Sequence, residues 1–318
     1  MLEMDVWYGT HQKFGHLGMP QKFINVLARV TRAETIVSAT ATVNDIITLD
    51  LTIGPDRRRL NSPGDLNAEI NPQYLRDGVN TLTLRAQDVT GDVVEKQVYL
   101  EYCAQQTGTL PCAIEWNRAS NLQEVAQVVD GKWAIENDTV RCVEPGYDRL
   151  IAIGDVAWRD YQVAVPITFH RFDPVGLRFP SVGQWAGLVL RWQGHADWSA
   201  DQPWRGWYPL GAIIHYGFRK KTQRSELRMF GNNGFAIADD RNGTELALGK
   251  RYWFQARVES LANKPSRYTL KVWPDGMDES HACSMIGVGS PDELKHGSLV
   301  LAAHHTDASF GTIRVNPI

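Results

Sequence analysis

The side chains of this sequence whose types and spacing could do chemistry gather between residues 185 and 228. Read with the period of two that a β-strand imposes, the segments 187–195, 212–219 and 226–230 each have an apolar and a polar face. Arginine and glutamine bond hydroxyl and carboxylate oxygens, and a histidine that is neutral at pH 7 can accept a proton. The polar faces carry six such residues: Arg191, Gln193, His195, His215, Glu226 and Arg228.

Between the first two segments lies an aromatic loop, residues 197–209, which is interrupted by glycine and proline. Its aromatic residues are Trp198, Trp204, Trp207 and Tyr208, and it has few of the aliphatic residues that a core would need. Indole rings pack against the C–H faces of sugars while nearby polar groups bond the hydroxyls. Loop and strands together predict a carbohydrate-binding surface. The alternative is structural, since tryptophan lids and solvated strand faces are common in β-sandwiches.

Length and charge narrow the classes of protein. A chain of 318 residues predicts two domains, and 43% hydrophobic with 22% charged residues is the composition of a globular protein. The net charge of −3 argues against general nucleic-acid binding, and the short basic run at residues 57–59 is read as a solvated strand or turn. The sequence has no run of 18 apolar residues, so it predicts no membrane-spanning segment. The sequence leaves the oligomeric state open.

The compartment is also open from the sequence. The first residues, MLEMDVWYG, do not form a signal peptide, so the protein is intracellular, or secreted or periplasmic if a leader was removed. Four cysteines allow three pairings. The pairing favoured in an oxidising compartment joins Cys103 to Cys112 and leaves Cys142 and Cys283, which lie far apart in sequence.

Residues 1–102 read as short strands separated by turns, with strands expected at 22–30, 34–44 and 45–54. A hairpin follows at 79–100, with its turn at 88–92. The pattern around this hairpin resembles that of bacterial immunoglobulin-like and fibronectin-III-like modules. It consists of Leu75, Gly78, Asn80, Leu82, Ala86, Asp88 and Gly91. The resemblance implies a β-sandwich and no particular function. Residues 103–112, polar and without periodicity, are the expected linker.

Residues 113–318 predict about ten further strands, which indicates a second, larger antiparallel sandwich. Five segments in order resemble concanavalin A-like lectin and glucanase domains, including laminin-G-like ones. They are DGKW at 130–133, the run Trp158, Asp160, Tyr161 and Val163, the segment GLVLRW at 187–192, RYWFQARV at 251–258 and the end of the chain from His304 to Val315. The resemblance implies a jelly-roll sandwich with a concave face that commonly holds glycans. The fold class expected is therefore all-β throughout.

The sequence leaves catalysis open. The E-x-D-x-x-E strand of glucanases of this fold is absent. RSELR at 224–228 resembles a strand of jelly-roll alginate lyases, and Gln193 to His195 is similar to their Q-x-H element, although the two come in the opposite order here and the Y-F-K-A-G strand is missing. This resemblance implies that arginine and glutamine neutralise a uronate carboxylate while a histidine or tyrosine moves the proton. The candidate catalytic residues are His195, His215, Tyr216 and Glu226.

No cofactor is required by these motifs. A structural Ca²⁺ held by Asp307 is one expectation, common in relatives of this fold, and a turn aspartate that bonds backbone is the other. His304 is expected to bind substrate. Adjacent strand residues point to opposite faces, so His304 and His305 are not expected to share a metal. The sequence thus predicts a protein that binds an oligo- or polysaccharide. Lyase or glycosidase activity on it, and a non-catalytic adhesive or structural role, are the alternatives.

Overall fold

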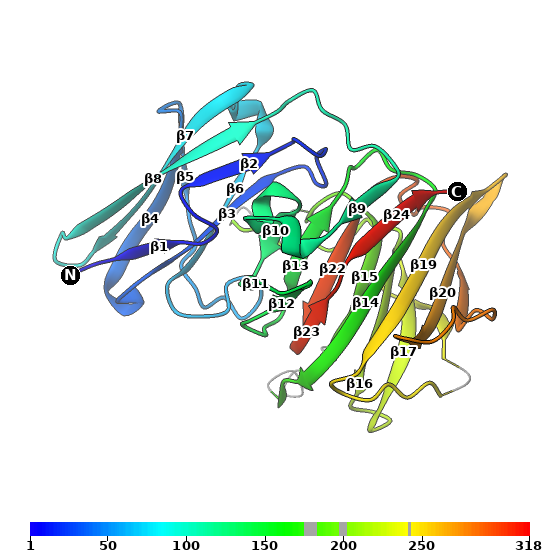
Figure 1. The fold of residues 1–318 in the computed structure, drawn as a ribbon. Coiled ribbons are helices and arrows are strands. Elements are labelled where there is room, and N and C mark those ends of the chain that lie inside the picture. Colours follow the sequence, from blue (N-terminus) through cyan, green and yellow to red (C-terminus); the bar gives the residue numbers. More distant parts are fainter. Residues whose placement is uncertain (175–182, 197–201, 241–242) are drawn as a thin grey trace.

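The computed structural model is all-β, as the sequence predicts (Figure 1). It describes residues 1–174, 183–196, 202–240 and 243–318. Within these ranges the complete helical elements are four single 3₁₀ turns, and no helix is long and apolar enough to cross a membrane. The turns are Ala33–Thr35, Pro72–Tyr74, Trp116–Arg118 and Leu122–Glu124.

The amino-terminal module is made of two sheets whose strands all come from residues 1–102. Alternating side chains such as Val26, Ala41, Leu82 and Leu100 meet between the sheets in a separate core. One sheet has the order β1 (Met4–Val6), β3 (Ile24–Val30), β6 (Asp65–Ile70); the other has β2 (His11–Phe14), β8 (Val93–Tyr102), β7 (Gly78–Asp88), β4 (Ile36–Val43), β5 (Ile47–Asp50). That this module is immunoglobulin-like stays a prediction.

The carboxy-terminal module is a sandwich of two larger sheets around an apolar core (Figure 1). The seven-stranded sheet has the order β10 (Gln127–Asp130), β13 (Arg149–Ile153), β22 (Ser298–His304), β15 (Gln184–Trp192), β16 (Ala212–Arg219), β17 (Arg224–Gly231), β18 (Ala236–Asp239). The nine-stranded sheet has β11 (Trp133–Glu136), β12 (Thr139–Cys142), β23 (Thr306–Phe310), β14 (Tyr161–Phe172), β19 (Arg251–Leu261), β20 (Lys264–Pro274), β21 (Met285–Val288), with β24 (Ile313–Pro317) on β14 and β9 (Cys112–Ile114) on β24.

The segment between the modules differs in two ways from the expected linker. Strand β9 begins at Cys112, and the Gly108 amide donates a hydrogen bond to Asp155, so the segment is packed against the second module. All four cysteines are free, and the expected Cys103–Cys112 bond is not formed. Cys112 is instead held in β9 by pairing with Val315 of β24. Whether residues 103–112 separate two units that fold alone stays a prediction.

The two modules meet through a largely buried surface, in which Trp7 and Leu27 of the first module pack into the second module's core. The other apolar residues of β3 and β6 face the first module's own core, and their polar residues lie toward β10. Asn25, Asp65, Asn67 and Glu69 are each at most 3% exposed. Buried polar groups must be hydrogen-bonded, and Asn67 meets this need across the interface by donating to the Val129 carbonyl and to Asp130.

Candidate functional site

A row of aromatic side chains crosses the outer face of the seven-stranded sheet, the face turned away from the core between the sheets. His304 lies 5.3 Å from the Trp185 ring and nearly parallel to it, and His215 lies 4.8 Å from Trp185 on the other side. Tyr147 contacts His304 edge-on at 4.4 Å, and Phe230 stacks on His215 at 5.5 Å. These five rings are called the aromatic row below. Each strand contributes through its outward-facing positions, because Ala186, Ile214 and Met229 point into the core.

Two hollows lie over the aromatic row. The first, of about 230 Å³, is lined by the row together with Asp148, Trp207 and Tyr208. The second, of about 270 Å³, shares Trp185, His215 and Phe230 with the first and extends over the β16–β17 hairpin. Its further lining includes four basic residues: Arg219, Lys220, Lys221 and Arg228. The two hollows form one cleft that is aromatic at one end and cationic at the other.

Asp148 anchors two of the groups in the aromatic part of the cleft. Its carboxylate accepts a hydrogen bond from Trp207 Nε1 at 3.1 Å and lies 3.2 Å from His304 Nδ1. Burial raises the pKa of Asp148 to about 7, and burial together with nearby Arg149 lowers the pKa of His304 to about 3. Both shifts disfavour a charged pair. At neutral pH His304 is therefore a neutral imidazole, and an Nδ1–H bonded to Asp148 leaves Nε2 as a proton acceptor.

The middle and the cationic end of the cleft contain polar atoms without a partner. Burial, with help from Arg228 and His304, lowers the pKa of His215 to about 3, and its Nδ1 has no hydrogen-bond partner among the described residues. Arg228 lies 4.3 Å over the Phe230 ring, and its buried Nε likewise lacks a hydrogen bond, with the Glu226 carboxylate 3.6 Å away. Burial and Arg219 lower the pKa of Arg228. A water molecule or a ligand group that enters the cleft can supply the missing bonds.

Three of the six predicted polar residues come together in this way. His215, Glu226 and Arg228 share the outer face of β16 and β17, where His215 pairs in register with Arg228. Glu226 bonds Arg219 at 3.1 Å and so holds the hairpin's cations rather than lining a hollow. Trp207, Tyr208 and His304 line the first hollow, and their binding of substrate stays a prediction.

The prediction that Arg191 binds substrate is wrong, because the strand does not keep its period of two at this residue. A β-bulge at Arg191, with φ of 52°, shifts the register of β15 against β22 between Leu190 and Trp192. The Arg191 side chain is fully buried away from the cleft and bonds Asp160, Ser260 and Ser266. It stabilises loops of the sandwich and is unavailable to a ligand in the cleft.

Gln193, His195 and Trp204 are also placed away from the cleft. Gln193 bonds His296. His195 lies beneath Trp207, with its ring nitrogens 3.2 Å from Asp130 and from the Gly206 carbonyl. Trp204 packs edge-on against Phe23 of the first module. No pattern in the sequence indicates that the first module covers this part of the sheet.

The predictions for Tyr216, Trp198 and Asp307 have three different outcomes. Tyr216 faces the core, because it neighbours His215 on the strand, and its hydroxyl bonds Leu246. Trp198 lies outside the described residues. Both carboxylate oxygens of Asp307 are bonded by Arg141, each at 2.9 Å, so the expected calcium ligand is an ion-pair partner. No group of metal-ligating side chains occurs in the described ranges.

Sequence reasoning missed four residues of the cleft and the basic run beside them. Tyr147 and Asp148 lie in the turn before β13, where no alternation points to them. Phe230 lies in the expected strand 226–230 and Trp185 just before the expected strand 187–195, but neither is among the predicted site residues. The run from Arg219 to Arg228 contains five cations and one carboxylate, a basic stripe that could have been found by counting charge along the sequence.

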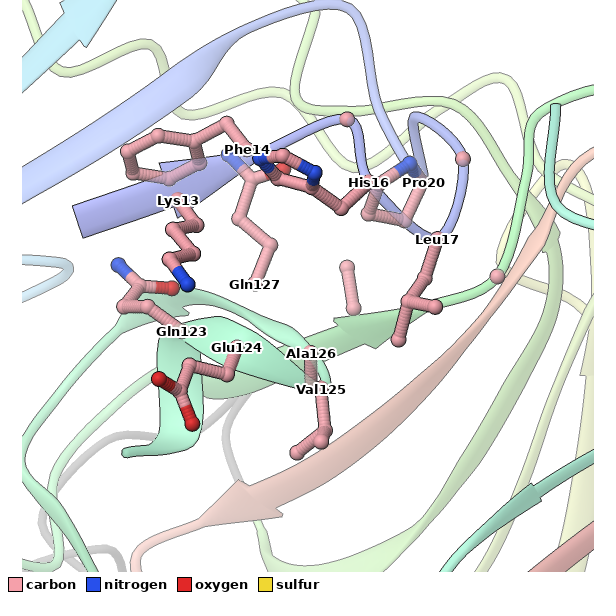
Figure 2. A pocket seen from close by; sticks show the side chains of 14 residues that line it. Lys13, Phe14, His16, Leu17, Pro20, Gln123, Glu124, Val125, Ala126 and Gln127 are labelled. Carbon is pink, nitrogen blue, oxygen red and sulfur yellow. The ribbon is translucent and has the colours of Figure 1, made fainter. Parts of the chain in front are cut away.

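Another hollow lies between the modules and is lined from both (Figure 2). Lys13, Phe14 and His16 of the first module face Gln123 and Gln127 of the second. Its volume is only about 30 Å³, enough for one water molecule and too small for a sugar.

Comparisons with known proteins give a loose likeness of fold. No family model and no curated protein matches the chain. Among solved structures, the alginate lyase Aly36B is 12% identical with a TM-score of 0.39, over 65% of this chain and 97% of that one. The exoplasmic/lumenal domain of VIP36, bound to Ca²⁺ and Man3GlcNAc, is 13% identical with a TM-score of 0.41, over 61% of this chain and 86% of that one. These scores are low and identify no family.

Proposed function

We propose that this protein binds a polysaccharide in the cleft over the aromatic row. The observation that supports this best is the first hollow, in which aromatic rings surround a few fixed polar groups, Asp148, His215 and His304. Such a lining suits a pyranose, whose C–H groups pack on aromatic carbon and whose hydroxyls bond imidazole and carboxylate. The adjoining cationic end favours a glycan that carries carboxylate or sulfate groups.

A panel of polysaccharides tests this proposal directly. Affinity electrophoresis in gels that contain alginate, polygalacturonate, heparin, galactomannan or xyloglucan measures retardation of the whole chain. We expect retardation by at least one polyanion and weaker retardation by the neutral glycans, with the difference shrinking as salt is added. If no gel retards the protein more than a gel without polysaccharide does, the proposal is wrong.

A lyase that cleaves an acidic glycan by β-elimination is the second candidate. It is favoured by the position of Arg228 and the hairpin cations beside neutral imidazoles. The cations would bind the uronate carboxylate and acidify the C5 proton. His304 Nε2 would take that proton, the C5–H electrons would form the C4–C5 double bond as the C4–O bond breaks, and a tyrosine hydroxyl would protonate the leaving oxygen. Burial and Asp148 raise the pKa of Tyr147 to about 12, which keeps this hydroxyl protonated.

The products separate the enzymatic alternatives from simple binding. Prolonged incubation with the retained polysaccharide should give ultraviolet absorbance from an unsaturated uronide if the chain is a lyase, and His304→Ala should abolish it. New reducing ends without absorbance would indicate hydrolysis instead. The described lining of the cleft offers the single carboxylate of Asp148, whereas glycosidases of the usual kind need two. Binding without product would identify a binding module.

A further inference from the structure

The walls of the cleft stand on two loops that rest on the amino-terminal module. The loop 202–207 carries Trp207, and the turn before β13 carries Tyr147 and Asp148. Within the second module, Gly206 pairs with Ala196, and the Gly146 carbonyl accepts a hydrogen bond from the His305 amide. Both loops make further contacts with the first module, at its loop 54–62 and at strand β6.

Arg59 of that loop holds the Trp207 loop through a fully buried network. Its guanidinium bonds Asp130 at 2.6 Å, Glu69 at 2.7 Å and the Trp204 carbonyl. The other oxygen of Glu69 accepts a hydrogen bond from the Trp204 amide at 2.6 Å. The bond from Arg59 and the bond to Glu69 therefore both hold the backbone of Trp204, three residues before Trp207. Because charges buried at 0–3% exposure are costly to move, this network fixes the loop in one place.

The other wall is held by the same loop of the first module. Arg149 is 1% exposed and donates hydrogen bonds to the carbonyls of Arg58 and Arg59. Gly146 packs so close to Asn61 that an added Cβ would lie 2.7 Å from its side-chain oxygen. The Arg58 guanidinium lies over the Tyr147 ring at 5.4 Å from its centroid, on a residue that lines the first hollow.

We propose that the carbohydrate cleft is a two-module site. Arg58 supplies a cation at its rim that contacts an anionic group of the glycan, and Arg59 with Glu69 positions the loop of Trp207. The inference rests on the proposed function for its ligand, whereas the positioning of the loop can be measured without one. It gives the amino-terminal module a direct part in recognition instead of the role of a spacer.

Two neighbouring arginines provide a test variant and a matched control for the contact between Arg58 and the glycan. Arg58→Gln removes the cation beside Tyr147, and Arg57→Gln removes an exposed cation from the next residue of the same loop. In affinity electrophoresis with polygalacturonate or alginate, we expect Arg58→Gln to weaken binding about ten-fold, as for loss of one charge-assisted bond, and Arg57→Gln to change it less than two-fold. Equal behaviour of the two variants, beside a wild type that binds, would overturn the contact.

The positioning is tested with an isosteric change. Glu69→Gln places an amide where both oxygens are needed as acceptors, so we expect faster hydrogen exchange of the peptide 202–210 and weaker polysaccharide binding. The control is Glu95→Gln, which alters an exposed ion pair with Arg85 in the same module. If Glu69→Gln fails to fold, Arg205→Gln breaks the looser 3.4 Å pair with Asp56 between the same loops and is measured in its place.

The outcomes separate this inference from the function on which it rests. Faster exchange confined to 202–210, with binding weakened and the unfolding midpoint nearly unchanged, supports the two-module site. Unchanged exchange in both Glu69→Gln and Arg205→Gln overturns the positioning whether or not a glycan binds. A wild type that binds none of the polysaccharides removes the proposed function and the Arg58 contact together.

Discussion

The outer faces of the two sheets in the carboxy-terminal module differ in how their polar groups are satisfied. The nine-stranded sheet has the larger hollow, about 460 Å³, but its charges are matched into pairs. Glu259 bonds Arg267 at 2.6 Å and Arg257 at 3.4 Å, and Lys271 bonds Glu279 at 2.7 Å. Each of the two hollows on the seven-stranded sheet is smaller, but they are lined by histidines whose pKa burial lowers to about 3. Desolvation, rather than volume, therefore marks the candidate site.

Aromatic residues show the same contrast. Trp253 and Trp273 stack at 6.1 Å on the outer face of the nine-stranded sheet, where Trp253 donates its Nε1–H to Asp275. Trp185 on the seven-stranded sheet lies instead between two imidazoles and lines both hollows. A tryptophan pair alone does not make a site, because a strand surface produces such pairs by register.

The largest effect is expected from truncating one tryptophan on each face. Trp185→Ala removes the middle of the aromatic row and should weaken polysaccharide binding about 100-fold or more, as for a central aromatic anchor. Trp273→Ala should change it less than two-fold. Affinity electrophoresis measures both, and thermal unfolding of each variant shows whether the fold survives. Equal losses of binding would abolish the distinction between the faces.

A smaller effect is expected from single cations on the two faces. Arg228→Gln should weaken binding of uronate polysaccharides about ten-fold and leave neutral glycans nearly unaffected, since one charge-assisted bond is lost. Arg267→Gln on the nine-stranded sheet is the control, because Arg267 already has Glu259 as a partner. A uniform loss for charged and neutral glycans in Arg228→Gln would mean that this side chain shapes the cleft without selecting charge.

Part of this contrast could be predicted from the sequence. Alternation in 212–219 and 226–230 correctly placed His215, Glu226 and Arg228 on one face, because neither strand is interrupted there. The all-β class followed from turn spacing in the same way. Strand β6 was not among the expected strands, although Leu66, Ala68 and Ile70 alternate with polar residues. Those polar residues are buried against the other module.

The rest depended on contacts that a single sequence does not encode locally. The bulge at Arg191 resets the strand's alternation through the carbonyls of Leu190 and Arg191, which both accept from the Gly211 amide. His195 and Trp204 are buried by the first module, whose docking no pattern near them indicates. Tyr147 and Asp148 belong to a turn, where side-chain direction follows tertiary packing rather than a period.

The pH dependence of stability provides a third test of the desolvated face. Burial lowers the pKa of His215 and His304 to about 3 and of His305 to about 4. Each takes up a proton on unfolding once the pH is below its unfolded value, about 6.5, so its stabilising contribution is lost as the pH falls from 6.5 toward 4. The raised pKa of Asp148 acts in the opposite direction over this window and offsets part of the loss.

Urea unfolding at pH 7.5 and pH 5 measures this loss. We expect a lower free energy of unfolding at pH 5, and a smaller difference between the two pH values in His215→Phe, which keeps the stacking on Phe230 and removes one titrating group. His281→Phe, in an exposed loop, is the control. A pH dependence in His215→Phe equal to that of the wild type would mean that His215 is not desolvated.

The smallest effect is expected at Asp307, on the face where charges are paired. Asp307 lies in β23, and Arg141 bonds both of its carboxylate oxygens. Asp307→Asn keeps the size of the side chain and loses the charge, so the free energy of unfolding should fall by about 1 kcal/mol, as for a partly exposed pair. Because the pair already neutralises the carboxylate, Ca²⁺ or a chelator should not shift the unfolding midpoint of the wild type. An unfolding midpoint that rises with Ca²⁺ in the wild type and not in Asp307→Asn would contradict this result. It would show that Asp307 binds Ca²⁺.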